Sequence, residues 1–283
     1  MACGEVVERT VGPLPIGASE SGATTFLEVL RSRFVAEPER VALHFLSDDD
    51  GIESVRCGAL DAVASRVAAA LQRRVSAGER VALLLPPGRS FVAGFLGCVY
   101  AGCIAVPLYP PRPGEGRRRL ERLASVLDDC RPAAVLSTDA LLGLQEELDD
   151  VTGAASAASW LALDALESAE AVEWREPVLR ASSTAFLQYT SGSVGDPAGV
   201  VISHANLVSQ HRILERVVGT TPESVVVSWL PPYHDMGLIG TILHPLAAGC
   251  LGVLLSPIDF LARPVRWLRA LTRYGGTHSV APN

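Results

Sequence analysis

Short runs of continuous apolar residues alternate with helical patterns along most of this chain. The run 81–85 (VALLL) lies between an amphipathic helical pattern at 59–74 and a more apolar helix near 89–101. A strand without polar positions is buried on both faces, which is typical of a parallel sheet covered by helices. We therefore expect an α/β fold, with further strands at 104–106, 133–136, 186–189, 200–202, 225–227, 251–255 and 278–280 and further helices at 117–129, 205–217, 237–248 and 263–274.

The amino-acid composition limits the classes of protein to which this chain can belong. Of the 283 residues, 48% are hydrophobic and 19% are charged, which suits a sizeable core and argues against a disordered chain. The net charge of −7 argues against a nucleic-acid partner, since binding to phosphate backbones needs clustered basic charge. All 24 cationic side chains are arginines, because the sequence contains no lysine. Chemistry that needs a lysine amine within these residues is therefore excluded.

The six cysteines favour a reduced, soluble protein. None forms a C-x-x-C pair, and the closest two, Cys98 and Cys103, lie in apolar stretches. We expect buried thiols rather than disulfides or a metal site. The N-terminus lacks a signal-peptide pattern, and the longest apolar stretch, 91–106, falls short of a membrane span. These features predict a cytoplasmic protein without stable membrane insertion.

A glycine- and serine-rich segment at 189–200 (YTSGSVGDPAGV) is the strongest candidate for a ligand-binding loop. Its glycines allow close approach of the backbone, and its hydroxyls and free N–H groups can surround phosphate oxygens. A serine-rich hairpin turn would have a similar composition. The candidate binding residues are Thr190, Ser191, Gly192, Ser193 and Gly195.

Two other motifs do not fit this segment. A Walker A loop needs G-x-x-x-x-G-K-[ST], but Pro197 stands five residues after Gly192 and no lysine follows. A nucleophile elbow needs G-x-S-x-G, but the residue two positions before Ser193 is Ser191. A hydrolase is therefore weakly supported.

The segment resembles the phosphate loop of the adenylate-forming superfamily, which usually reads Y-T-S-G-S-T-G-x-P-K-G-V. A second segment, 229–238 (WLPPYHDMGL), is similar to the W-x-P-x-x-H-x-x-G signature of the same superfamily. The two segments occur in the expected order along the chain. Within the superfamily the chain resembles the fatty acyl-AMP ligases most, through the strings at 105–111, 186–190, 197–200, 233–238, 260–264 and 281–283.

This resemblance covers nearly the whole chain, from about Phe26 onward, with two departures in the phosphate loop. Val194 replaces the usual threonine and removes a hydroxyl group. Asp196 adds a negative charge beside the expected triphosphate. Both changes bear on the affinity for ATP, whereas the backbone N–H donors of the loop are retained.

The resemblance implies an architecture of two stacked α/β subdomains with mostly parallel sheets flanked by helices. Residues 1–283 would be a partial AMP-binding (adenylation) domain, with a tentative division near 149–183. The small C-terminal domain that carries the adenylation lysine would be absent. The chain enters an expected strand at 278–280 and stops at Asn283, which also indicates a truncated domain.

The implied activity is ATP-dependent conversion of a fatty acid to an acyl-adenylate, with Mg²⁺ accompanying ATP. The acyl group would pass to an acyl carrier protein of a polyketide or lipopeptide pathway. The loop would hold the phosphates, and His234 would be the catalytic residue beside the acyl carboxylate. Taken alone, the His234-Asp235 pair is more typical of a polar turn. An acyl-CoA synthetase and a non-catalytic nucleotide- or acyl-binding fragment remain alternatives.

Other polar residues are interpreted as structural. His204 begins a helix, and His211, His244 and His278 have no partners at metal-ligand spacing. The arginines at 117–119 open an exposed helix. A solvated helix face is favoured there over a surface that docks an acidic carrier protein.

Overall fold

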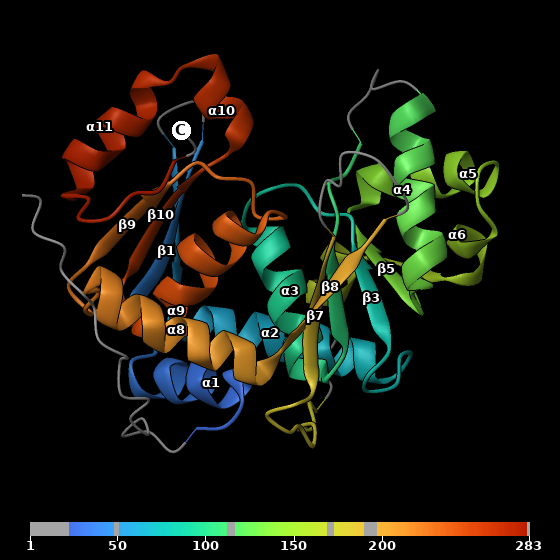
Figure 1. Cartoon of the computed structure of the whole chain (residues 1–283), viewed down its shortest axis with the longest axis horizontal. Helices are drawn as coiled ribbons and strands as arrows, with labels where there is room; N and C mark the ends of the chain where they lie inside the picture. The colour runs from blue at the N-terminus through green and yellow to red at the C-terminus, as the bar shows by residue number, and fades with distance from the viewer. Residues whose placement is uncertain (1–22, 48–50, 112–116, 169–172, 190–196, 282–283) are drawn as a thin grey trace, which may run out of the picture.

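The strands form two sheets in a computed structural model that describes residues 23–47, 51–111, 117–168, 173–189 and 197–281 (Figure 1). The four-stranded sheet has the order β2-β1-β10-β9, with bounds Ile52–Arg56, Val41–Leu46, Leu251–Leu255 and Val225–Ser228. The six-stranded sheet has the order β6-β5-β3-β4-β7-β8, with bounds Ser159–Ala162, Ala134–Ser137, Arg80–Leu83, Ile104–Pro107, Thr184–Tyr189 and Gly199–Ser203. Pairing is parallel except between β1 and β2 and between β7 and β8.

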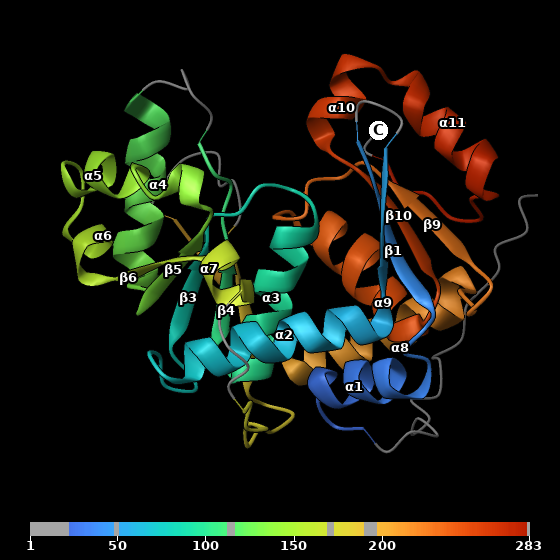
Figure 2. The ribbon, with the colours of Figure 1, turned by 180° about the vertical axis from the view of Figure 1, so that it is seen from behind.

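Helices α2 (Cys57–Gln72) and α3 (Arg89–Ala101) lie between the two sheets, as both views show (Figures 1 and 2). The largest hydrophobic core joins these helices to both sheets. Every residue of α3 from Phe91 to Ala101 is buried, which explains why this segment is apolar all round. Gly102 ends α3 with a φ of 74°, a left-handed conformation that glycine adopts without strain. The expected fold class of stacked, mostly parallel α/β units is confirmed.

The outer faces of the sheets carry the remaining helices. Helix α4 (Arg117–Cys130) covers the six-stranded sheet together with α5 (Leu144–Asp149) and α6 (Gly153–Ala157) (Figure 1). The four-stranded sheet packs against α11 (Val265–Tyr274), which follows α10 (Pro257–Ala262). The other helical segments are α1 (Phe26–Ala36), η1 (Asp139–Leu141), α7 (Leu163–Ser168), α8 (His204–Val218), η2 (Met236–Leu243) and α9 (His244–Ala248).

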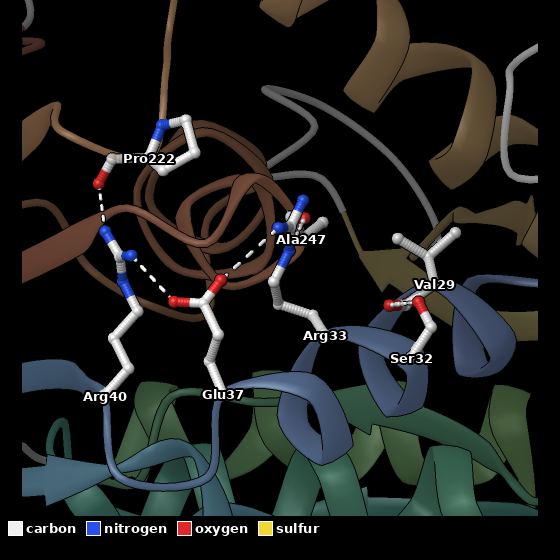
Figure 3. Close-up of polar contacts among 7 residues, drawn as sticks. All are labelled: Val29, Ser32, Arg33, Glu37, Arg40, Pro222 and Ala247. Atoms are coloured by element: carbon white, nitrogen blue, oxygen red, sulfur yellow. Dashed lines mark hydrogen bonds and ion pairs between the residues drawn. The ribbon is translucent and has the colours of Figure 1, made fainter.

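Polar contacts tie α1 to elements far along the chain, as Figure 3 shows. Arg33 donates from Nε to the carbonyl O of Ala247 at 3.4 Å, and Ser32 donates to the carbonyl O of Val29 within the helix. Glu37 pairs with Arg33 at 3.8 Å and with Arg40 at 2.9 Å. Arg40 also donates to the carbonyl O of Pro222, so α1 and the turn after it are joined to the segments on either side of β9.

Three sequence expectations change in the structure. Residues 149–183 do not separate the two sheets: they contain α6, β6 and α7, and β6 pairs with β5 inside the six-stranded sheet. The expected helix at 237–248 is a π-helix (η2) followed by the short helix α9. At 278–280 the structure has one parallel bridge, between His278 and Val226, rather than a strand. Strands β1, β2 and β6 were not predicted from the sequence.

Two further observations concern the part of the chain that the structure describes. The cysteines there, Cys57, Cys98, Cys103, Cys130 and Cys250, are free and buried, as expected. No helix in the described ranges combines the length and the apolar character needed to cross a membrane.

Three buried histidines make the stability of this fold depend on pH. Burial lowers the pKa of His204, His211 and His244 to about 4 in each case. The Nδ1 atoms of His211 and His244 lie 2.9 Å apart, and Thr220 Oγ1 lies 2.7 Å from the Nε2 atom of His244. Two imidazolium ions cannot share this contact, so the folded state favours neutral rings.

Acidification should therefore destabilise the protein. Histidine titrates near pH 6.5 in an unfolded chain, so stability is full above that pH and is lost as the pH falls from about 6.5 to 4. One such histidine accounts for about 3 kcal/mol across this range. Urea denaturation at several pH values measures the slope. The double variant His211→Asn/His244→Asn should show a flatter dependence, and an unchanged slope would contradict the assignment.

Candidate functional site

The candidate phosphate loop connects β7 to β8. Its candidate binding residues Thr190, Ser191, Gly192, Ser193 and Gly195 lie outside the described residues, as do Val194 and Asp196. The structure does describe the base of the hairpin, where Tyr189 pairs with Gly199. A β-carbon at position 199 would lie 3.0 Å from the Tyr189 ring, so glycine gives the ring room over the neighbouring strand.

The tyrosine at the start of this loop is held by a second contact. Its hydroxyl donates a hydrogen bond to Asp129 Oδ2, at the end of α4. Burial and this carboxylate raise the pKa of Tyr189, so the hydroxyl keeps its proton. Both ends of the loop therefore start from fixed positions on the six-stranded sheet.

His234 lies in a tight turn between β9 and η2. Its N–H donates to the carbonyl O of Pro231 at 3.1 Å, and its own carbonyl accepts from the N–H of Leu238 at 2.8 Å. The side chain is 66% exposed, and its Nδ1 lies 2.5 Å from Asp235 Oδ1. With Nδ1 engaged by this carboxylate, Nε2 is the ring nitrogen left for a ligand.

The turn depends on a glycine and leads into a π-helix. A β-carbon at Gly237 would lie 2.1 Å from the carbonyl O of Pro231, so no other residue fits without moving the backbone. The π-helix η2 starts at Met236, and single π-helical turns are frequent at functional sites. This geometry is compatible with a ligand-binding turn.

One side chain connects the two candidate segments. Gln188, in β7, donates from Nε2 to the carbonyl O of Tyr233 at 3.0 Å. The Tyr233 ring meets Tyr109 edge to face with centroids 4.6 Å apart. The guanidinium of Arg119 lies 4.1 Å from the centre of the Tyr109 ring. Tyr233, the residue before His234, is therefore contacted by Gln188 of β7 and by Tyr109 of the segment after β4. Tyr109 is in turn contacted by Arg119 at the start of α4.

In the sequence, Gln188, Tyr109 and Tyr233 lie in segments that resemble the family, but nothing there assigns these three residues a role. Their mutual contacts could not be inferred from spacing, because 45 positions separate Gln188 from Tyr233. The arginines at 117–119 have contacts within the fold: Arg117 pairs with Glu121 at 3.1 Å, and Arg119 covers Tyr109. These contacts support the structural interpretation of that helix.

A cleft of about 580 Å³ opens between the two sheets. Its walls include residues at the carboxyl ends of β1 and β10, the turn after β3, and Leu230 and Pro232 from the segment before His234. The carboxyl ends of parallel strands are the usual place for ligands in α/β proteins. The remaining lining combines apolar side chains with the charged residues Glu53, Arg89 and Asp259.

His234 does not line this cleft, although it lies two residues beyond Pro232. Arg89 lies at the N-terminus of α3 and pairs with Glu167 at 2.8 Å and with Glu53 at 3.5 Å. Its charge is therefore already matched by two carboxylates, and the cleft has both apolar and polar walls. A cavity of this size and lining suits an organic ligand.

A family profile described as AMP-binding enzyme matches residues 30–283. Among curated proteins, the chain is 38% identical to the long-chain-fatty-acid AMP ligase FadD26 of Mycobacterium marinum, covering 90% of this chain and 45% of the relative. It is 34% identical to the medium-chain-fatty-acid acyl-carrier-protein ligase JamA of Moorena producens, covering 92% of this chain and 44% of the relative. The chain thus spans less than half the length of these relatives.

Comparison with solved structures indicates the same family. A fatty acyl-adenylate ligase from L. pneumophila, in complex with acyl adenylate and pyrophosphate, matches with a TM-score of 0.82 and 34% identity. The match covers 92% of this chain and 44% of that protein. The adenylation region of McyG, at 21% identity and a TM-score of 0.83, shares the fold. The chain belongs to the family of AMP-binding enzymes and is a relative of its fatty acyl-AMP ligases.

Proposed function

We propose that this chain forms the part of an adenylating ligase that brings a fatty acid to the phosphates of ATP. A carboxylate oxygen of the acid attacks the α-phosphorus, an O–P bond forms, and the bond to the β-phosphate breaks to release pyrophosphate. The products are an acyl-adenylate and pyrophosphate. The acyl group then passes to the thiol of a carrier protein, and AMP leaves.

The observation that carries this proposal is the direct contact between the two motif-bearing segments. The strand that leads into the phosphate loop holds the turn that presents His234, through the hydrogen bond from Gln188 to Tyr233. This contact supports a function in which the proposed anion-binding loop and the exposed imidazole of His234 act on the same pair of substrates. Aligning a carboxylate and a phosphate in this way lowers the barrier through positioning and charge stabilisation, without a covalent enzyme intermediate.

The residues that the structure describes give no separate cage for a metal ion. In the described ranges, no group of three or more His, Cys, Asp or Glu side chains is arranged to hold one. We propose that Mg²⁺ enters with the ATP phosphates, where it neutralises charge, and that any protein ligand comes from outside these described residues.

Substitutions in the phosphate loop test its role. Ser191→Ala and Gly192→Val should each slow acid-dependent ATP–pyrophosphate exchange by about a hundredfold, the usual cost of losing one preorganised oxyanion donor. Val194→Thr, which restores a hydroxyl, should keep or raise the rate. The assay uses the full-length gene product. An unchanged rate of ATP–pyrophosphate exchange in both loop variants would contradict the proposal that this loop binds the ATP phosphates.

The role of His234 is tested by comparing the effect of a substitution on acid-dependent turnover with its effect on ATP binding. His234→Ala should slow adenylation and weaken acid-dependent turnover more than it weakens ATP binding, because the imidazole is placed beside the carboxylate. The exposed ring has few contacts to lose, so the folded state should keep its stability. Normal kinetics would leave His234 as a residue of the turn only.

Product analysis separates the remaining alternatives. One relative at 35% identity, FadD21 of Mycobacterium tuberculosis, is described as a putative fatty-acid CoA ligase. Incubation with ATP, Mg²⁺, a fatty acid and either CoA or a carrier protein shows which acceptor is used. Acyl-CoA as the product would favour the synthetase, and the absence of any acyl-adenylate would favour a binding fragment.

A further inference from the structure

Two consecutive helices beside the four-stranded sheet expose large apolar side chains. Ile258 and Leu261 of α10 and Val265 and Leu268 of α11 each keep between 43% and 69% of their surface exposed. The two helices pack against each other at the outer end of the molecule, and α11 also packs against β9 and β10 (Figures 1 and 2). Single exposed apolar residues are ordinary, but four of them on two adjoining helices indicate a contact surface.

Helix α11 carries three kinds of side chain around its axis. Its inner face packs on the four-stranded sheet through Trp267, Ala270, Leu271 and Tyr274. Residues four apart are neighbours on a helix, so Val265 lies beside Arg269, and Arg269 lies beside Arg273. The outer surface of α11 therefore carries apolar and cationic side chains next to one another. This combination is typical of helices that lie in the plane of a membrane interface.

The arginines of this region outnumber its acids. A groove beside α11 is lined by four arginines and, among the described residues, by no Asp or Glu: Arg263, Arg266, Arg269 and Arg273. Within residues 256–274 the one acid is Asp259, which pairs with Arg266 at 3.9 Å. Four arginines and one aspartate give this segment a net charge of +3, in a chain whose net charge is −7.

Three aspartates at 48–50 stand between the groove residues Ser47 and Gly51 in the sequence and lie outside the described residues. The described charges of the surface match an anionic partner.

We propose that α10 and α11 form a peripheral docking surface for an anionic lipid bilayer. The exposed apolar side chains enter the boundary between headgroups and acyl chains, and the arginines contact the lipid phosphates. A bilayer is favoured over a protein partner because the core of a protein interface contains few charges, whereas arginines stand between the exposed apolar residues here.

This surface adjoins the cleft between the sheets. Ser256, the N-cap of α10, and Asp259 in its first turn both line that cleft. The opposite side of the same helix exposes Ile258 and Leu261. A bilayer bound to α10 and α11 is therefore close to the cleft. The docking itself does not depend on the proposed function, so the two can be tested separately.

Sedimentation with lipid vesicles measures the docking directly. The full-length gene product should bind vesicles of phosphatidylglycerol and phosphatidylcholine at least about tenfold more tightly than vesicles of phosphatidylcholine alone. Added salt should weaken this binding, because exposed charges are screened. No binding to the mixed vesicles, or equal binding to both kinds, would overturn the proposal.

Paired substitutions of apolar residues locate the surface. Leu261→Gln/Leu268→Gln changes size little and should weaken vesicle binding by about tenfold or more, since two apolar side chains no longer enter the lipid. Ile213→Gln/Val217→Gln makes a similar change at exposed positions of α8 and should leave the binding unchanged. Equal effects of the two pairs would contradict the assignment to α10 and α11.

Paired substitutions of arginines test the electrostatic part. Arg263→Gln/Arg269→Gln should weaken binding to the mixed vesicles by about fivefold for each arginine removed. Arg118→Gln/Arg122→Gln removes the same charge from the exposed start of α4 and should keep the affinity. The same loss in both pairs would indicate attraction by overall charge and would reject a defined docking surface.

Stability and oligomeric state separate a bilayer from other occupants. The leucine and arginine pairs on α10 and α11 should keep the Tm of the unsubstituted protein, because these side chains are exposed. A lower Tm would show that another part of the gene product covers or pairs with them, and would overturn the proposal. A dimer in size-exclusion chromatography that Leu261→Gln/Leu268→Gln dissociates would assign the surface to a second copy instead.

Discussion

Alanine at position 237 should disrupt the His234 turn and with it most of the activity. Its β-carbon would lie 2.1 Å from the carbonyl O and 2.8 Å from the carbonyl C of Pro231, and 3.2 Å from the carbonyl O of Leu230. These neighbours are backbone atoms of the same turn, so relief requires moving the chain beside the cleft. We expect a loss of about 3 kcal/mol in the free energy of unfolding, at the upper end of overpacking effects.

The neighbouring Gly240 provides a matched control. It lies in the same π-helix, and a β-carbon there would meet nothing within 4 Å. Gly240→Ala should therefore be neutral or stabilising by up to about 1 kcal/mol, because alanine favours helix over glycine. Chemical denaturation of the 283-residue chain compares the two variants, and adenylation by the full-length gene product gives the activity. Equal stabilities for Gly237→Ala and Gly240→Ala would contradict the steric argument.

The 283-residue chain by itself should form acyl-adenylate about a thousandfold or more slowly than the full-length gene product, which corresponds to about 4 kcal/mol of barrier. In the adenylate-forming superfamily that the sequence resembles, a lysine addresses the charge around the α-phosphate, and this chain contains no lysine. Its 24 arginines are poor substitutes, since a planar guanidinium differs from an amine in shape and reach.

The measurement is acyl-adenylate formation from ATP, Mg²⁺ and a range of fatty acids by both proteins at equal concentration. A binding control with a non-reactive acyl-adenylate analogue separates loss of chemistry from loss of fold. Equal turnover by the two proteins would show that the reaction does not depend on a lysine outside these residues. That result would contradict the mechanism that the family resemblance implies.

The prediction for the 283-residue chain rests on its sequence, and the prediction for Gly237→Ala rests on its structure. The missing lysine is read directly from the sequence, whereas the constraint on Gly237 required coordinates. The string around His234 indicated a functional turn, but a glycine three positions after a histidine has many conformations available. Only the folded turn shows that the α-carbon of Gly237 lies against the carbonyl of Pro231.

Much of the architecture followed from local patterns. Strand β10 and helix α3 begin and end where the sequence predicted, because β10 is an apolar run that ends before Ser256 and α3 is a largely apolar stretch between Gly88 and Gly102. Strands β1 and β2 were missed for the opposite reason. Polar residues interrupt both strands, such as His44 in β1 and Glu53 and Ser54 in β2, so neither strand is apolar from end to end.

The sequence by itself determined the class of fold, because continuous apolar strands are a local pattern. It determined the family through the resemblance of two segments, 189–200 and 229–238, to known signatures, which is also a local property. Tertiary structure alone decided which strands are neighbours, such as the pairing of β4 with β7 and of β1 with β10. It also decided that Gln188 contacts the residue before His234. Contacts of this kind arise from the packing of the whole sheet, in which residues distant along the chain share one partly buried hydrogen bond.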